Sequence, residues 1–271
     1  MEYHALFTDF DGTLRTNASG VKISEANIKA IHTAKAAGKH VVICSGRSWK
    51  SLAPYEEMLG LNKPGGHGVA FNGGVVYAYT EKGREILFRQ TMETATAHNI
   101  IRQLRQLASP EVKIFAYDGN DDLYAEEHLR GKVRFGEDSY LELAFVDDFL
   151  EMTNGFSKFV LLGDNSELKK IANQVSGDYD TVFSAHDLFE FVPPGVNKGQ
   201  GVAFLADYLK IPMEKIIAMG DEGNDAAMLK RAGLGVAVAN ATAPAKEVAD
   251  IVLAESCDED AVSVVINRYL L

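Results

Sequence analysis

The chain has 271 residues, of which 46% are hydrophobic and 24% are charged, a balance typical of soluble globular proteins. These values exclude a disordered or collagen-like chain and a multispan membrane protein, and the length allows one large domain or two ordinary ones. The formal net charge of −11 opposes binding to nucleic-acid phosphates, and no basic patch offsets it, so we expect no nucleic-acid partner.

The N-terminal residues predict neither secretion nor a membrane anchor. They include Glu2, Asp9 and Asp11 with no apolar segment of the signal-peptide type, and the chain has no run of about 18 apolar residues. The cysteines, Cys44 and Cys257, are too few for a disulfide framework, and the histidines lack zinc-ligand spacing. We therefore expect a cytoplasmic protein with no membrane span, in which Cys44 is a buried core thiol.

The first part of the chain alternates short apolar runs with helical patterns. Residues 5–8 predict a buried strand, and residues 40–44 predict a second one. Between them, Ser24 is a candidate helix N-cap and Gly38 stands where that helix should end. Another helix is expected near residues 48–59, so strands and helices alternate here.

A hairpin is expected next. Residues 69–71 and 75–77 are apolar and flank Asn72-Gly73-Gly74. Asparagine and glycine tolerate the positive φ angles of a tight turn, so this segment predicts two antiparallel strands joined by that turn.

The middle of the chain, residues 82–190, has a different pattern. Amphipathic helices mix there with strand-like runs that are rich in aromatic residues. Turn-rich segments at residues 81–83 and 193–195 mark its two ends. We therefore expect an inserted α+β domain over residues 82–190, with residues 1–81 and 191–271 forming the other domain.

The last part again alternates helices and strands. Helices are expected near residues 198–209, 224–231 and 259–270, and strands near residues 215–219 and 235–238. Strands that alternate with helices imply right-handed crossovers between parallel strands. The fold class predicted for the outer segments is therefore α/β, with a doubly wound, Rossmann-like parallel sheet.

Three of the expected strands end in polar residues suited to chemistry. The first ends in Asp9-Phe10-Asp11-Gly12-Thr13, the second in Ser45-Gly46-Arg47, and a third in Gly220-Asp221-Glu222-Gly223-Asn224-Asp225. Ligands of open α/β sheets bind beyond the carboxyl ends of the strands. If these strands are neighbours, the three clusters meet at one place.

The residue types at these strand ends favour magnesium and phosphate. Asp9, Asp11 and Asp221 would repel one another strongly unless a cation joined them, and oxygen ligands without histidine or cysteine favour Mg²⁺. Ser45-Gly46 at a strand–helix junction suits a phosphate group, and Lys198 supplies a point cation at the start of another helix. Together these groups are of the types that phosphoryl-transfer enzymes use at their active sites.

Each of these features alone has an ordinary structural explanation. Asp11-Gly12 and Asn72-Gly73 are typical of turns, Ser45 of a helix cap and Lys198 of a solvated surface. The functional interpretation depends on the whole set, which arrives in order and at strand ends.

As a set, these segments resemble a known superfamily. Asp9-Phe10-Asp11-Gly12-Thr13-Leu14, Ser45-Gly46-Arg47, Lys198-Gly199 and the segment 220–225 are similar to the four signature motifs of the haloacid dehalogenase (HAD) superfamily of phosphatases. The inserted segment resembles the large α/β cap, type IIB, of its Cof-type subfamily. The resemblance covers essentially the whole chain.

The resemblance implies a role for each carboxylate in the motifs. Asp9 would be the nucleophile, which becomes an aspartyl phosphate, and a Mg²⁺ ligand. Asp11 would be the general acid and base, and its backbone carbonyl would bind the metal. Asp221 would be the second carboxylate ligand, and Asp225 would orient Lys198 or the waters on the metal.

The resemblance also implies which groups would hold the transferring phosphoryl group. These are Ser45, Lys198, Asn224 and the backbone amides of Phe10 and Gly46. Arg47 and Asn72 would lie where the leaving group or the cap is met.

We therefore expect an enzyme: a Mg²⁺-dependent phosphatase for small phosphate esters such as sugar phosphates or phosphorylated cofactors. A phosphosugar mutase of the same superfamily and a noncatalytic regulator that binds a phosphorylated metabolite are the alternatives.

Overall fold

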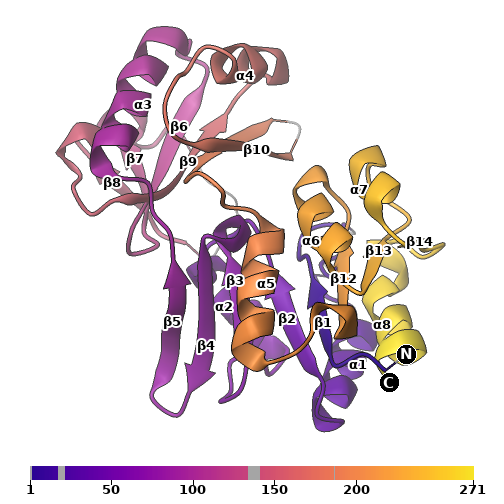
Figure 1. Cartoon of the computed structure of the whole chain (residues 1–271). Coiled ribbons are helices and arrows are strands. Elements are labelled where there is room, and N and C mark those ends of the chain that lie inside the picture. Colours follow the sequence, from indigo (N-terminus) through magenta and orange to yellow (C-terminus); the bar gives the residue numbers. More distant parts are fainter. Residues whose placement is uncertain (1, 18–21, 134–140, 186) are drawn as a thin grey trace. The chain divides into compact units, whose positions relative to one another are not determined.

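The computed structural model describes residues 2–17, 22–133, 141–185 and 187–271 (Figure 1). The chain divides into two compact units, one formed by the residues up to Arg89 together with Asn197–Leu271, and the other by Gln90–Val196. Both divisions lie several residues beyond the boundaries predicted at 81/82 and 190/191.

The strands next to the boundaries explain this difference. β5 (Gly83–Arg89) pairs antiparallel with β4 (Val75–Thr80), so it stays in the sheet of the first unit. β11 (Leu188–Val192) pairs with β9 (Phe156–Leu162) in the sheet of the second unit. A turn-rich segment marks a change of direction, but strand pairing decides which unit a strand joins.

The first unit contains an eight-stranded sheet in the order β14-β13-β12-β1-β2-β3-β4-β5. Neighbouring strands from β14 to β3 are parallel, and the last two pairs are antiparallel. The strands not yet given are β1 (Ala5–Thr8), β2 (His40–Cys44), β3 (His67–Ala70), β12 (Ile216–Gly220), β13 (Leu234–Ala237) and β14 (Ile251–Val252).

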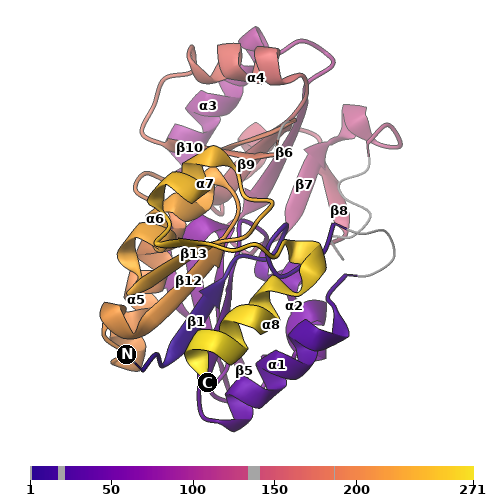
Figure 2. The same ribbon diagram turned by 90° about the vertical axis from the view of Figure 1, so that its right-hand side faces the viewer.

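Helices cover both faces of this sheet, as a doubly wound fold requires. Figure 2 shows α5, α6 and α7 on one side and α1 and α8 on the other. The helices of this unit are α1 (Glu25–Ala36), α2 (Trp49–Met58), α5 (Lys198–Leu209), α6 (Ala226–Arg231), α7 (Ala243–Val248) and α8 (Ala261–Val265). The predicted α/β fold class is confirmed.

The helix starts follow from local side-chain chemistry. Ser24 caps α1 by accepting a hydrogen bond from the N–H of Asn27, and Ser48 caps α2 in the same way. Asn197 caps α5, since its Oδ1 accepts from the N–H of Gln200 at 3.0 Å. This last cap places Lys198 on the first turn of α5.

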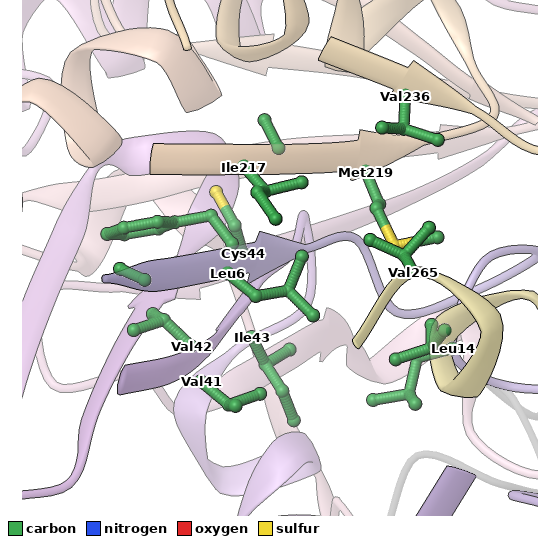
Figure 3. Close-up of a cluster of buried hydrophobic side chains, with 14 of the residues drawn as sticks. Leu6, Leu14, Val41, Val42, Ile43, Cys44, Ile217, Met219, Val236 and Val265 are labelled. Atoms are coloured by element: carbon green, nitrogen blue, oxygen red, sulfur yellow. The ribbon is translucent and has the colours of Figure 1, made fainter. Parts of the chain in front are cut away.

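The core lies between the central strands and the helices on either face. Figure 3 shows Leu6 of β1, Ile43 of β2 and Ile217 of β12 packed together, with Val265 of α8 beside them. Cys44 is fully buried in this core, as predicted, and burial raises the pKa of its thiol.

The second unit is an α+β domain, as predicted. Its six-stranded sheet has the order β10-β11-β9-β6-β7-β8, and all pairs are antiparallel except β7 with β8. Buried side chains of both helices join Phe159, Phe189 and Phe191 in one cluster, so the helices cover one face of the sheet. The remaining elements are β6 (Lys113–Asp118), β7 (Leu123–Glu126), β8 (Leu143–Val146), β10 (Asp180–Ala185), α3 (Thr94–Leu107) and α4 (Asn165–Ala172).

Among the helices that the structure describes, none has the length and apolar character needed to cross a membrane.

Candidate active site

The carboxyl ends of the central strands bring the predicted motifs together. β1 pairs in parallel with both β12 and β2, so the residues that follow these strands share one edge of the sheet. Asp9 follows β1, Ser45 follows β2 and Asp221 follows β12. The expectation that these strands are neighbours is therefore confirmed.

Three carboxylates form a compact group at this edge. Asp9, Asp221 and Asp225 each offer a carboxylate oxygen, and these atoms lie within 4.8 Å of one another. All three residues are buried, with exposed fractions of 6%, 7% and 0%. Such a group carries concentrated negative charge away from water, which is costly unless a cation compensates it.

Lys198 provides part of this compensation. Its ammonium donates to Oδ1 of Asp9 and lies 2.5 Å from Oδ1 of Asp225. The other oxygen of Asp225 accepts from the backbone N–H groups of Asp221 and Glu222, at 2.8 and 2.9 Å. Asp225 therefore fixes Lys198 from one side and the turn after β12 from the other.

The charge of Lys198 alone does not offset the effects of burial and of mutual repulsion on the pKa values of the carboxylates. Burial raises the pKa of Asp9 well above its ordinary value; Lys198 counteracts this, while the neighbouring carboxylates add to it. Burial and the charge of Asp225 raise the pKa of Asp221 to about 7. Burial alone would lower the pKa of Lys198, but the carboxylates of Asp225 and Asp9 outweigh it, so the ammonium stays charged.

The donor set fits a divalent cation that prefers oxygen. The clustered ligand atoms are carboxylate oxygens, as Mg²⁺ prefers. The sequence predicted Asp9, Asp221 and the backbone carbonyl of Asp11 as ligands. In the structure the carboxylate group contains Asp225 as well, and the side chain of Asp11 is not part of it.

Gly12 is required by the close approach of Asp221. Its φ angle is +79°, and a Cβ atom there would lie 2.3 Å from Oδ2 of Asp221. Thr13 donates its hydroxyl to Oδ1 of the same carboxylate at 3.0 Å. The first motif therefore shapes the pocket of Asp221 across the β1–β12 pair.

Two residues that contact this site were missed by sequence reasoning. Asn240 donates its amide to the carbonyl of Gly12 at 2.8 Å, and Thr242 donates its hydroxyl to the carbonyl of Asp221 at 3.1 Å. Both follow β13, the neighbour of β12. A search for polar residues just after the strand predicted at 235–238, as was made for the other motifs, would have found them.

Asp11 and Arg47 form a two-pronged ion pair. Nε of Arg47 donates to one oxygen of Asp11 at 2.6 Å, and Nη2 donates to the other at 2.7 Å. Nη1 donates to the hydroxyl of Ser51 at 3.2 Å. The Asp11 side chain is 43% exposed, so this carboxylate, unlike that of Asp9, is open to solvent.

The second motif and Asn224 meet around Asn72. The hydroxyl of Ser45 accepts from the N–H of Arg47 at 3.1 Å, and the amide of Asn224 donates to Oδ1 of Asn72 at 3.1 Å. Gly46 lies against Asn72, because a Cβ atom on Gly46 would be 3.2 Å from that amide.

Phe10 has a fully buried side chain that packs on Tyr55, with ring centroids 4.6 Å apart. Phe10 can therefore offer its backbone, but not its side chain, to a ligand at this edge.

A doubly wound sheet with buried carboxylates and a buried lysine at its strand ends is an arrangement suited to phosphoryl transfer. The family model for haloacid dehalogenase-like hydrolases matches residues 6–266. The chain belongs to this family, which confirms the resemblance carried by its four motifs and the expectation of an enzyme.

The chain is also similar to individual proteins. Over 285 aligned positions the chain is 30% identical to endoribonuclease YBEY, chloroplastic, of Arabidopsis thaliana. The alignment covers 99% of this chain but 47% of that protein. The chain therefore spans about half the length of that relative. It is also 26% identical to pyridoxal phosphate phosphatase YbhA of Escherichia coli (strain K12), over 100% of both chains.

A solved structure has the same fold. The haloacid dehalogenase-like hydrolase from Bacteroides thetaiotaomicron matches with a TM-score of 0.84 and 28% identity, over 98% of this chain and 99% of that one.

Proposed function

We propose that the enzyme is a Mg²⁺-dependent phosphomonoesterase that acts on small phosphorylated metabolites, such as sugar phosphates or phosphorylated cofactors. The observation that carries this proposal is the buried group of Asp9, Asp221 and Asp225 with Lys198 between two of its members. The relative named as a pyridoxal phosphate phosphatase supports the substrate class.

The first chemical step uses Asp9 and Asp11. A carboxylate oxygen of Asp9 attacks phosphorus and the bond from phosphorus to the ester oxygen breaks. The carboxyl of Asp11, which must leave its ion pair with Arg47 and take up a proton before this step, gives that proton to the departing oxygen. The product on the enzyme is an aspartyl phosphate at Asp9. Mg²⁺ at the carboxylate group would supply positive charge that offsets the carboxylates and the phosphoryl oxygens.

The second step returns the enzyme to its starting state. The carboxylate of Asp11 takes a proton from water, and the water oxygen attacks phosphorus while the bond from phosphorus to Asp9 breaks. Inorganic phosphate leaves, and Asp9 is again a carboxylate.

The remaining site residues hold the phosphoryl group during both steps. We assign this role to Ser45, Lys198, Asn224 and the backbone N–H groups of Phe10 and Gly46. Asp225 supports the assignment of Lys198, since it holds that ammonium beside Asp9.

The second unit, Gln90–Val196, is proposed to choose the substrate. Every residue assigned to the chemistry lies in the first unit. The phosphoryl group is common to all substrates, so its ligands cannot distinguish one substrate from another. The leaving group must be recognised by other residues, and an inserted unit that acts as a lid can do this while excluding water.

The test is a screen of phosphate release over sugar phosphates, nucleotides, flavin mononucleotide and pyridoxal phosphate, with Mg²⁺ and with EDTA. We expect release that requires Mg²⁺. Isomerised sugar phosphates without released phosphate would favour the mutase instead. Binding of a phosphorylated metabolite with no turnover would favour a regulator, and turnover unchanged by EDTA would contradict the metal assignment.

A further inference from the structure

The turn between β3 and β4 has an unusual backbone. It is a short 3₁₀ segment, η1 (Phe71–Gly73), in which Phe71 and Asn72 have φ angles of +49° and +54°. Two consecutive residues with side chains in the left-handed region are uncommon and cost conformational energy. Such strain persists only where the surrounding structure enforces it.

The surrounding structure consists of three segments that the proposed function uses. The N–H of Asn72 donates to the carbonyl of Ser45 at 2.9 Å, and the N–H of Phe71 donates to the carbonyl of Arg47 at 3.0 Å. Gly73 lies against the start of α5, because a Cβ atom there would be 2.3 Å from the carbonyl oxygen of Asn197. The turn therefore lies between the second motif and the helix that begins with Lys198.

The side chain of Asn72 extends this contact to a third segment. It is 1% exposed, and its Oδ1 accepts from the amide of Asn224 at 3.1 Å. The Oδ1 atom of Asn224 is buried and accepts no hydrogen bond from the described residues. The bond to Asn72 uses one N–H of the Asn224 amide and fixes its direction, and the second N–H on the same nitrogen is the one that can donate to a phosphoryl oxygen.

We propose that Asn72 is a positioning residue of the phosphate site, which acts by holding the amide of Asn224 toward the phosphoryl group. This inference rests on the proposed function, in which Asn224 is a phosphoryl ligand. A hairpin turn alone would explain an exposed Asn-Gly pair. It does not explain why the Asn72 side chain is buried or why its oxygen accepts a hydrogen bond from a residue 152 positions away.

The backbone of Gly46 is part of the same arrangement. A Cβ atom on Gly46 would lie 3.2 Å from both polar atoms of the Asn72 amide. Asn72 therefore lies between Gly46 and Asn224, two residues assigned to the phosphoryl group.

The test is a double-mutant cycle in the full-length enzyme with Asn72→Gly, Asn224→Ala and the double variant. Glycine adopts the left-handed turn without a side chain, so Asn72→Gly removes the amide and keeps the backbone. The readouts are inhibition by inorganic phosphate, KM and kcat for the best ester found in the screen, and thermal unfolding.

We expect Asn72→Gly to weaken binding of inorganic phosphate about tenfold, the scale of one hydrogen bond to a charged group, and to raise KM similarly. The double variant should bind phosphate no worse than Asn224→Ala alone, because Asn72 acts through Asn224. Asn72→Ala, run alongside, should match Asn72→Gly in phosphate binding but melt at a lower temperature, since alanine disfavours the turn.

Wild-type phosphate binding in folded Asn72→Gly, or independent losses in the double variant, would overturn the positioning role. An Asn72→Gly protein that does not fold would overturn it too, since the Asn72 side chain would then be required for folding rather than for positioning Asn224. A wild-type enzyme that hydrolyses none of the esters would contradict the proposed function instead.

Discussion

Asp9 lies where two effects on its charge oppose each other. Burial and the nearby carboxylates raise its pKa, whereas Lys198 stabilises its charged form. Removing the charge of Asp9 therefore removes the proposed nucleophile and also relieves repulsion within the group.

Asp9→Asn is expected to lower turnover by about 10³-fold or more, because the amide cannot form the aspartyl phosphate. The melting temperature of the metal-free protein should not fall. Phosphate release and thermal unfolding measure the two effects, with Asp207→Asn, an exposed carboxylate of α5, as the control. Wild-type turnover in the purified variant, free of host phosphatase, would refute the assignment.

Loss of a residue that only hydrogen-bonds to a metal ligand typically lowers metal affinity ~10–100-fold. Asp221→Ala removes a proposed ligand itself, so we expect it to weaken Mg²⁺ activation by more than this. Thr13→Val is the matched comparison, since it removes the hydroxyl that donates to Asp221 but leaves the carboxylate. A Mg²⁺ titration of activity compares the Mg²⁺ concentration needed by the wild type, Thr13→Val and Asp221→Ala. Equal Mg²⁺ dependence in wild type and Asp221→Ala would exclude Asp221 from the metal site.

Arg47 holds both oxygens of Asp11, so its effect should depend on the leaving group. Arg47→Lys keeps the charge but loses the two-pronged geometry. We expect up to about 10²-fold lower kcat for an alkyl phosphate, the lower end of what general acid catalysis contributes. Hydrolysis of p-nitrophenyl phosphate, whose leaving group needs little protonation, should change much less. Equal losses on both esters would argue that Arg47 does not act through Asp11.

At the scale of elements, α2 is joined to β4 by a buried polar contact. Glu56 of α2 is fully buried and accepts from the hydroxyls of Tyr77 and Tyr79, each at 2.7 Å. Burial raises the pKa of Glu56 to about 7, although both hydrogen bonds lower it. α2 also begins just after Arg47, so this contact anchors the helix that follows the second motif.

The raised pKa of Glu56 predicts how stability changes with pH. Folding takes up a proton at Glu56 between its ordinary pKa, about 4.5, and about 7, so its contribution to stability is lost as pH rises through this window. The loss is on the order of 3 kcal/mol at pH 8. Glu56→Gln should remove this pH dependence, whereas Glu247→Gln, at an exposed position, should keep it.

Urea unfolding of the wild type and both variants from pH 5 to 8 measures this effect. A Glu56→Gln protein whose stability falls with pH as steeply as that of the wild type would show that Glu56 does not take up the proton.

At the scale of the molecule, each unit has its own buried hydrophobic cluster. This organisation allows the chemistry and the choice of substrate to reside in different units. It also means that the two roles can be separated by deletion.

Replacement of Gln90–Val196 by a short Gly/Ser linker is expected to lower kcat/KM for the best substrate by a large factor. Hydrolysis of p-nitrophenyl phosphate should suffer much less, because a small activated ester needs little recognition. Circular dichroism and thermal unfolding must first show that the shortened protein is folded. If the folded deletion kept the full substrate ranking, specificity would reside in the first unit.

Much of the fold and the site could be predicted from short segments. The apolar runs at 5–8, 40–44 and 215–219 predict strands, and polar residues at their ends predict an acidic edge of a parallel sheet. The boundaries of the insertion were misplaced by several residues, because β5 is assigned by its pairing with β4, which its own residues do not specify.

The sequence by itself determined the α/β class, the inserted domain and the group of Asp9, Ser45 and Asp221 at strand ends, because apolar periodicity and strand termini are local properties. Tertiary structure alone decided that Asp225 joins the carboxylates, that Arg47 pairs with Asp11, and that Asn240 and Thr242 support the first motif and Asp221. The physical reason is that strand order and side-chain direction depend on which segments pack together, and this is fixed by the buried core as a whole rather than by any one segment.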